Sequence, residues 1–235
     1  KSVLSAFGGE LCMAVSGGAP ISQEIVDGFD ALGVTVVNGY GITECSPLVC
    51  ANHDDANDYH TAGIKLRCID WRIDEPDSDG VGEICIKGKT VMLGYYNQPE
   101  LTAEVIKDGW FYTGDYGYIN DKEQLVICGR KKNVIVLDNG KNIYPEEIEG
   151  YIQGIDFVSE VIVSGEHNDA SGNAKALIAE VFLSEKRTPG EVLRSIKDAC
   201  KELPIYKQIA KVKIRDNEFE KTTSNKIKRF ISKKN

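Results

Sequence analysis

The chain has 235 residues, of which 42% are hydrophobic and 27% charged, and its formal net charge is −8. This length supports one large domain or two small ones, and the composition is ordinary for a soluble globular protein. No apolar run approaches the ~20 residues that a membrane-spanning helix needs. The chain opens on Lys1 without an initiator methionine or a signal-peptide pattern, so we expect an excised part of a longer protein.

Cysteine and histidine usage argues against a disulfide framework and against a structural metal site. The cysteines are odd in number and form no Cys-X-X-Cys pair, whereas such frameworks and zinc sites show tighter, paired spacing. His53, His60 and His167 are scattered along the chain. We therefore expect reduced thiols, no metal-ligand cluster and a cytoplasmic protein.

Charge is distributed unevenly along the chain. Residues 201–235 hold eleven lysines and arginines against four acidic residues, which leaves −15 for the first 200 residues. A basic tail of this kind contacts nucleic acid or an anionic membrane, forms a solvated surface, or covers an anionic substrate such as a nucleotide. The acidic body and the lack of interleaved aromatic residues in the tail argue against nucleic acid.

The first fifty residues follow the order strand, helix, strand. An apolar run at 11–15 ends in Ser16-Gly17-Gly18-Ala19-Pro20, residues 21–32 have helical spacing, and 34–37 has the pattern of a buried strand. A second glycine turn, Asn38-Gly39-Tyr40-Gly41, follows. This order predicts part of a parallel α/β sheet, in which ligands gather at the carboxyl ends of the strands, where both turns lie.

From about residue 60 to 130 the pattern changes to short strands, which predicts a small antiparallel sheet or barrel. The expected strands are 64–73, 82–87, 110–113, 116–119 and 124–128. We expect a domain boundary at 130–133. Beyond it, the pattern predicts a short element at 134–137, a helix from Pro145, strands near 158–163 and 176–183, a helix near 189–202 and a strand near 210–215.

The clearest chemical motif is Tyr40-Gly41-Ile42-Thr43-Glu44. Thr43 can hydrogen-bond a phosphate oxygen, and Glu44 offers Mg²⁺ a hard oxygen ligand. Tyr40 offers a flat face for a base. Taken alone, the motif is equally well a plain turn before a helix, because short glycine motifs are not specific.

Three later positions add polar chemistry. Asp115, after Tyr112-Thr113-Gly114, could accept hydrogen bonds from both hydroxyls of a ribose, and Arg130 offers several donors to hydroxyls or phosphates. Lys226 lies in a dense basic run, where an ammonium group suits the charge that builds between a carboxylate and an α-phosphate. Taken singly, they indicate no more than a turn-capping aspartate, a surface arginine and a frayed basic terminus.

In order and spacing, these segments resemble the later core motifs of the adenylate-forming superfamily, which includes acyl-CoA synthetases, nonribosomal-peptide adenylation domains and luciferases. The resemblance covers nearly the whole chain. It is carried by Ser16-Gly17-Gly18-Ala19-Pro20, Tyr40-Gly41-Ile42-Thr43-Glu44, Tyr112-Thr113-Gly114-Asp115, Gly129-Arg130-Lys131-Lys132, Gly140-Lys141-Asn142-Ile143-Tyr144-Pro145-Glu146-Glu147-Ile148-Glu149 and Thr222–Arg229. The last two look most like the fatty acyl-CoA branch.

The resemblance implies that 1–131 is the C-terminal part of the large adenylation domain, with a parallel α/β part and a small β-barrel. Residues 132–235 would be a small α+β lid domain. The adenine pocket would be lined by Gly18, Ala19, Pro20, Gly39, Tyr40 and Gly41. Thr43 would contact the α-phosphate, and Glu44 would hold Mg²⁺. Asp115 and Arg130 would grip the ribose.

In the lid domain, the resemblance makes Lys132 the hinge about which the domain rotates between two half-reactions. Gly140 would lie along the path of the CoA pantetheine arm, and Lys226 would drive adenylation. The implied substrates are ATP, a fatty acid and CoA, with acyl-CoA, AMP and pyrophosphate as products. One lid can serve both steps if it presents Lys226 first and the Gly140 loop second.

The chain departs from the family pattern in two places. Asn225 stands where the family usually has glycine before the lysine, and asparagine tolerates left-handed backbone geometry. No Ser/Thr/Gly-rich loop ending in Pro-Lys-Gly occurs in the sequence. We therefore expect this chain to be inactive alone and to require the N-terminal part of the same enzyme.

Two other functions remain open at this stage. One is an adenylation domain that loads a carrier protein instead of CoA. The other is a non-catalytic nucleotide-binding module that binds a partner through its basic tail. We expect no nucleic-acid partner and allow a peripheral membrane contact through that tail.

Overall fold

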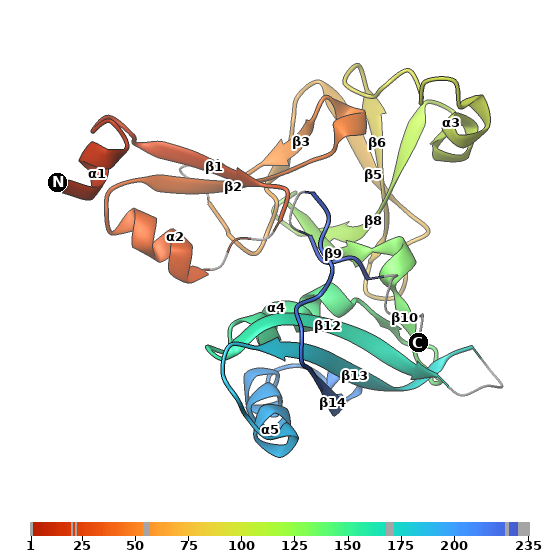
Figure 1. The fold of residues 1–235 in the computed structure, drawn as a ribbon. Helices are drawn as coiled ribbons and strands as arrows, with labels where there is room; N and C mark the ends of the chain where they lie inside the picture. Colours follow the sequence, from red (N-terminus) through yellow and green to blue (C-terminus); the bar gives the residue numbers. More distant parts are fainter. Residues whose placement is uncertain are drawn as a thin grey trace. The chain divides into compact units, whose positions relative to one another are not determined.

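The computed structural model describes residues 2–19, 21, 23–53, 57–167, 172–223 and 226–229. The chain divides into two compact units, Lys1–Lys131 and Lys132–Asn235, each with its own sheets and buried core (Figure 1). None of the described helices combines the length and the hydropathy that crossing a bilayer requires.

The first unit starts with a mixed sheet in the order β1-β2-β3-β4. Its elements are α1 (Ser2–Ala6), β1 (Met13–Gly17), α2 (Gln23–Asp30), β2 (Thr35–Gly41), β3 (Leu48–Ala51) and β4 (Ile64–Lys65). Strands β1 and β2 are parallel and connected through α2, which packs on β2. Strands β3 and β4 are added antiparallel. The predicted strand–helix–strand order is confirmed.

The glycine turn predicted at 38–41 is wrong. These residues continue β2, because Gly39 pairs with Gly17 of β1 on one side and with Ala51 of β3 on the other. Strand neighbours on both sides override the turn preference of asparagine and glycine. A side chain at Gly39 would be crowded, since a Cβ there would lie 3.2 Å from the carbonyl oxygen of Cys50.

The second sheet of this unit is antiparallel, with the order β5-β6-β8-β7 and β9 also paired to β8. Its strands are β5 (Ile69–Asp74), β6 (Gly82–Gly88), β7 (Ile106–Lys107), β8 (Trp110–Ile119) and β9 (Leu125–Arg130), and the helix α3 (Pro99–Val105) comes between β6 and β7 in the chain. The antiparallel prediction is confirmed. The single strand predicted at 64–73 is wrong, because the chain turns after Leu66 and passes from the first sheet to the second.

The strands predicted at 110–113 and 116–119 are one strand, β8, and the residues between them form a bulge within it. Cys85 lies opposite Tyr112 and Glu83 lies opposite Tyr116, so β8 carries extra residues between these pairs. Gly114 in this bulge has a φ of 68°, which glycine adopts without strain. The glycine signal thus marked an irregularity in the strand, but not its end.

The second unit has a sheet in the order β12-β13-β14 and a small hairpin. Its elements are β10 (Ile135–Val136), β11 (Asn142–Ile143), α4 (Pro145–Gln153), β12 (Val158–His167), β13 (Ala174–Leu183), α5 (Pro189–Ala199) and β14 (Ile209–Arg215). Helix α4 packs on β12, α5 packs on β14, and the helices contact each other. Pro145 opens α4, and a capping box between Thr188 and Glu191 opens α5. The predicted α/β and α+β fold class is confirmed.

Candidate functional site

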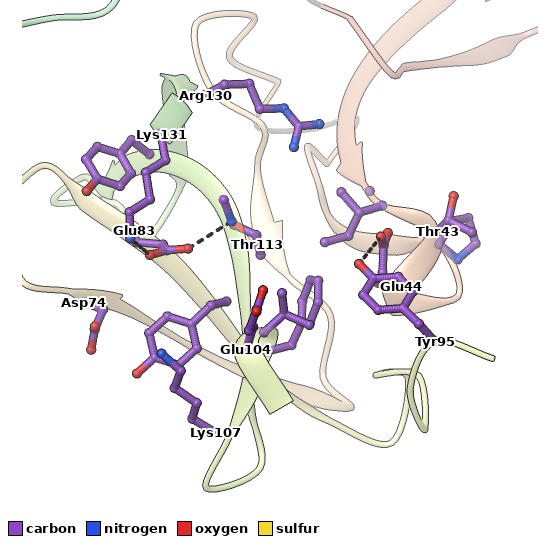
Figure 2. Close-up of a pocket in the computed structure, with 18 of the residues that line it drawn as sticks. Thr43, Glu44, Asp74, Glu83, Tyr95, Glu104, Lys107, Thr113, Arg130 and Lys131 are labelled. Atoms are coloured by element: carbon purple, nitrogen blue, oxygen red, sulfur yellow. Dashed lines mark hydrogen bonds and ion pairs between the residues drawn. The ribbon is translucent and has the colours of Figure 1, made fainter. Parts of the chain in front are cut away.

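A pocket of about 850 Å³ lies in the first unit, between the segment that follows β2 and the antiparallel sheet (Figure 2). Its polar and charged lining residues are Thr43, Glu44, Asp74, Glu75, Glu83, Tyr95, Glu104, Lys107, Tyr112, Thr113, Tyr116, Arg130 and Lys131. Figure 2 shows Thr43, Glu44 and Tyr95 on one side and the side chains of the antiparallel sheet on the other. Side chains of both signs therefore face one cavity.

Glu44 is held in place from two sides. A 3₁₀ turn, Thr43–Cys45, follows β2, and a Cβ at Gly41 would lie 2.5 Å from the carbonyl oxygen of Pro47, so only glycine fits there. The Tyr95 hydroxyl donates a hydrogen bond to Oε1 of Glu44 over 2.9 Å, and the Met92 amide donates to the Glu44 carbonyl over 2.8 Å. The carboxylate is thus preorganised beside the pocket.

Tyr40, Asp115 and Arg130 form a chain of contacts. The Tyr40 hydroxyl donates to Oδ2 of Asp115 over 2.5 Å, and Nε of Arg130 lies 2.9 Å from Oδ1. Burial, and then the charge of Asp115, raise the pKa of Tyr40 well above its usual value. Because β8 and β9 are antiparallel with Asp115 opposite Arg130, the sheet register itself makes the ion pair.

Burial differs sharply along this chain of contacts. Asp115 is only 4% exposed, whereas the Arg130 side chain is 49% exposed and lines the pocket. The ion pair runs through Nε, so the terminal nitrogens of the guanidinium can donate to a ligand. Asp115 therefore orients the arginine that reaches the pocket.

Glu83 was missed by the sequence reasoning. It is 7% exposed, and its carboxylate accepts from the Gly114 amide over 3.0 Å and from Nζ of Lys131 over 2.6 Å. The hydrogen bond with Glu83 raises the pKa of Lys131. A signal was present, because Glu83 is the charged residue inside the otherwise apolar buried run 82–86.

The predicted residues near the end of β1 lie beside β2. Gly17 pairs with Gly39, so the chain leaves β1 at Gly18, with a φ of 85°, beside β2. Of the described candidates, those that line the pocket are Gly41, Thr43, Glu44 and Arg130. Those that do not are Gly18, Ala19, Gly39, Tyr40 and Asp115. Pro20 lies outside the described residues.

In the second unit, Lys132 lies exposed in the 3₁₀ turn Lys131–Asn133. Gly140 lies exposed in the turn between β10 and β11, where its φ is 76° and its amide donates to the carbonyl of Leu137 over 2.8 Å. A residue with a Cβ would be strained at this φ. Both positions are thus surface turns, one beside the boundary of the units and one in a tight hairpin.

Lys226 is exposed, and the described segments before and after the preceding two residues pair with each other. Lys221 and Ile227 form an antiparallel bridge, and the Thr222 amide donates to the Lys226 carbonyl over 2.8 Å. The Lys226 amide also lies 3.2 Å from Oγ1 of Thr222. Ser224 and Asn225 lie outside the described residues. The described backbone before and after these two residues is therefore paired, and the role of Lys226 stays a prediction.

Comparison with protein families accounts for both units. Residues 3–96 match the model of the AMP-binding enzyme family, and residues 132–234 match that of the AMP-binding enzyme C-terminal domain. This chain belongs to the AMP-binding enzyme family. The resemblance drawn from the ordered motifs is confirmed.

Similar members of the AMP-binding enzyme family are ligases of long-chain fatty acids. The chain is 36% identical over 228 residues to a long-chain-fatty-acid–CoA ligase of Escherichia coli O6:H1, matching 93% of this chain and 39% of that protein. It is 34% identical over 169 residues to a chloroplastic long-chain-fatty-acid–[acyl-carrier-protein] ligase of Arabidopsis thaliana, matching 65% of this chain and 23% of that protein. The chain thus spans well under half the length of these relatives.

A solved AMP-binding enzyme has the same fold. The O-succinylbenzoate coenzyme A synthetase of Bacillus subtilis, in complex with ATP and a magnesium ion, superposes with a TM-score of 0.79 at 27% identity. The match covers 97% of this chain and 49% of that chain. The arrangement of strands and helices in both units is therefore the family's.

Proposed function

We propose that this chain supplies the rear of the nucleotide site and the moving lid of an AMP-forming long-chain fatty acyl-CoA ligase. The reaction joins a fatty acid and ATP into an acyl-adenylate with release of pyrophosphate, and CoA then displaces AMP. The observation that carries the proposal is the convergence of Gly41, Thr43, Glu44 and Arg130 on one pocket. The names of the long-chain ligases similar to this chain support the substrate class.

In this proposal, residues 1–131 belong to the large adenylation domain. The Thr43 hydroxyl donates to the α-phosphate, and Arg130, oriented by Asp115, donates to the ribose. Gly18, Ala19 and Gly39 leave backbone edges open beside the adenine. Tyr40 acts through its hydrogen bond to Asp115 as well as through its ring.

The pocket residues fit a magnesium ion that accompanies ATP. Mg²⁺ usually takes one or two protein carboxylates together with substrate phosphates. Glu44 faces the pocket with one carboxylate oxygen bonded to Tyr95, and the described residues contain no cluster of three or more His, Cys, Asp or Glu. Glu44 would hold the ion, which when bound neutralises phosphate charge.

Residues 132–235 act as the lid in this proposal, hinged at Lys132. The Lys226 ammonium lowers the barrier of the first step, because two anions, carboxylate and phosphate, must approach each other. The second step needs room for the CoA arm rather than this charge, which the Gly140 turn offers. Rotation of the lid lets the Lys226 ammonium group reach the site in the first step and the Gly140 turn in the second.

The proposed enzyme needs residues beyond this chain. The 235 residues contain no Ser/Thr/Gly-rich loop ending in Pro-Lys-Gly to hold the β- and γ-phosphates, and the similar ligases are more than twice as long. We expect a cytoplasmic enzyme whose basic tail makes at most a peripheral membrane contact. Pyrophosphate release from ATP and fatty acid by the 235-residue polypeptide would refute the statement that activity needs residues beyond this chain.

The test of the proposal is Lys226→Ala in the full-length enzyme. We expect ATP–pyrophosphate exchange to fall by about 10²–10³-fold, as for the loss of other groups that stabilise transition-state charge. Thioester formation from supplied acyl-AMP should be retained. Lys213→Ala, at an exposed lysine of the same unit, is the control. Equal loss of both half-reactions would rule out the two-step lid.

A carrier-protein acceptor is the second candidate, and the similarity to an acyl-carrier-protein ligase favours it. Free CoA and acyl carrier protein should be compared as acceptors with the same acyl-adenylate. Faster transfer to CoA supports the ligase proposed above. Transfer to the carrier protein alone would replace it.

A further inference from the structure

The turn that carries Lys226 is too short to be stable by itself. We call its described residues, 220–223 and 226–228, the lysine turn; the bridge of Lys221 with Ile227 and the hydrogen bond from the Lys228 amide to the Glu220 carbonyl pair its two sides. An isolated two-stranded hairpin is at best marginally stable in water. Its position must therefore come from contacts with the rest of the second unit.

One end of the lysine turn is attached to a buried carboxylate of β12. Glu160 is 7% exposed, and its Oε2 accepts from the amide of Phe219 over 2.7 Å. Its Oε1 lies 2.5 Å from Nζ of Lys221, the first strand-like residue of the turn. The Phe219 side chain is itself buried. Both oxygens of one carboxylate thus hold the chain where it enters the turn.

The other end is attached to a second carboxylate, on α4. Glu149 accepts from both terminal nitrogens of Arg229, with Nη1 at 2.8 Å from Oε1, directly after the turn. Its Oε1 also accepts from the amide of Val163 in β12 over 2.7 Å. A paired, two-pronged contact of this kind restricts angle as well as distance.

The two carboxylates share a common base. Because Glu149 on α4 is bonded to β12 through Val163, and Glu160 lies in β12, both anchors belong to one packed layer. Buried ion pairs contribute little net stability compared with apolar packing, since desolvation offsets their attraction. Their geometry, in contrast, selects one position for the groups they bind.

We propose that Glu149 and Glu160 are positioning residues that hold the two ends of the lysine turn and so set the place of the Lys226 ammonium group for adenylation. The inference rests on the role proposed above for Lys226. It adds two side chains that touch no substrate and act through Arg229 and Lys221.

The test uses Glu149→Gln and Glu160→Gln, which keep side-chain volume but remove the charge. The matched control is Glu147→Gln, on the same helix, because the Glu147 carboxylate is paired with Nζ of Lys207, which lies outside the turn. In the full-length enzyme we expect each anchor variant to lower kcat of ATP–pyrophosphate exchange by about tenfold or more. KM for ATP and thioester formation from acyl-AMP should change by less than about twofold.

A second measurement does not depend on activity. Hydrogen–deuterium exchange of the peptide spanning 219–229 should accelerate in both anchor variants and remain unchanged in Glu147→Gln. Arg229→Lys, which keeps one charged contact to Glu149, should exchange more slowly than Arg229→Gln and retain more adenylation activity.

Four outcomes would overturn the inference. Unchanged exchange of the turn in both anchor variants would mean that the carboxylates do not hold it. A loosened turn with normal adenylation, while Lys226→Ala abolishes adenylation, would refute the positioning role and leave the proposed function standing. Equal loss of both half-reactions would indicate a merely structural role. If Lys226→Ala itself leaves adenylation intact, the proposed role of the lysine fails, and the positioning role fails with it.

Discussion

The Tyr40 hydroxyl links the two sheets of the first unit, since Tyr40 lies in β2 and its acceptor, Asp115, lies in β8. Replacing Tyr40 with phenylalanine removes this one oxygen atom and keeps the ring, which is 9% exposed. The carboxylate then loses a donor in a site where water cannot readily replace it. We predict a measurable loss of stability of the first unit from this change alone.

The size of the effect follows from the kind of bond. A hydrogen bond to a charged group contributes about 1.5–3 kcal/mol, and Arg130 remains on the other carboxylate oxygen, so we expect a loss of about 2 kcal/mol. Burial raises the pKa of Tyr40 well above its usual value. The hydroxyl therefore stays a donor, and the loss should be the same at pH 6 and pH 9.

Urea unfolding followed by tryptophan fluorescence measures this loss. Both tryptophans, Trp71 and Trp110, lie in the antiparallel sheet of the first unit, so the signal reports that unit. With a slope of about 2 kcal/mol per molar urea, the midpoint should fall by about 1 M. Tyr59→Phe is the control, because its hydroxyl also donates to an aspartate, Asp30, over 3.2 Å, but at an exposed site.

We expect no measurable change for Tyr59→Phe, since water replaces the lost partner. Equal midpoint shifts in Tyr40→Phe and Tyr59→Phe would refute the reasoning, because burial would then add nothing to the hydrogen bond. A large shift in Tyr40→Phe that disappears at pH 9 would also contradict it, since the hydroxyl would be titrating in that range.

Two further predictions concern the helix cap of the second unit and the thiols. Thr188→Ala should speed amide exchange in α5 about fivefold, the equivalent of about 1 kcal/mol for a lost N-cap. Hydrogen bonds from the Thr188 amide and hydroxyl lower the pKa of Glu191 below 4.5. The contribution of this cap to stability is therefore complete above pH 4.5 and is lost as the pH falls through the pKa of Glu191 in the folded protein. An unchanged exchange rate of Thr188→Ala at pH 7 would contradict the cap. At pH 8, iodoacetamide should label the exposed Cys12 and Cys68 first, whereas burial raises the pKa of Cys85 to about 12 and should delay its labelling until unfolding. Mass spectrometry that finds Cys85 labelled as fast as Cys12 would contradict the predicted protection of the buried thiol.

Much of the local structure and the family could be predicted from the sequence. The apolar spacing of 21–32 predicted α2, and Pro145 predicted the start of α4, because periodicity and the restricted φ of proline act over a few residues. The ordered motifs likewise identified the AMP-binding enzyme family, since each motif is local and only their order had to be recognised.

Strand continuity could not be predicted in the same way. Residues 38–41 and 113–115 have the composition of turns, yet both lie within strands. Pairing partners on both sides decided this, and those partners are distant in the sequence.

Only the tertiary structure decided how the buried carboxylates are paired. Asp115 meets Tyr40 across 75 residues, Glu83 meets Lys131 across 48, and Glu149 meets Arg229 across 80. The sequence determined that these residues are polar, and that a carboxylate removed from water requires donors or a positive charge. The donor that each carboxylate meets depends on how strands and helices from distant segments pack, and the residues next to the carboxylate in the sequence do not determine that packing.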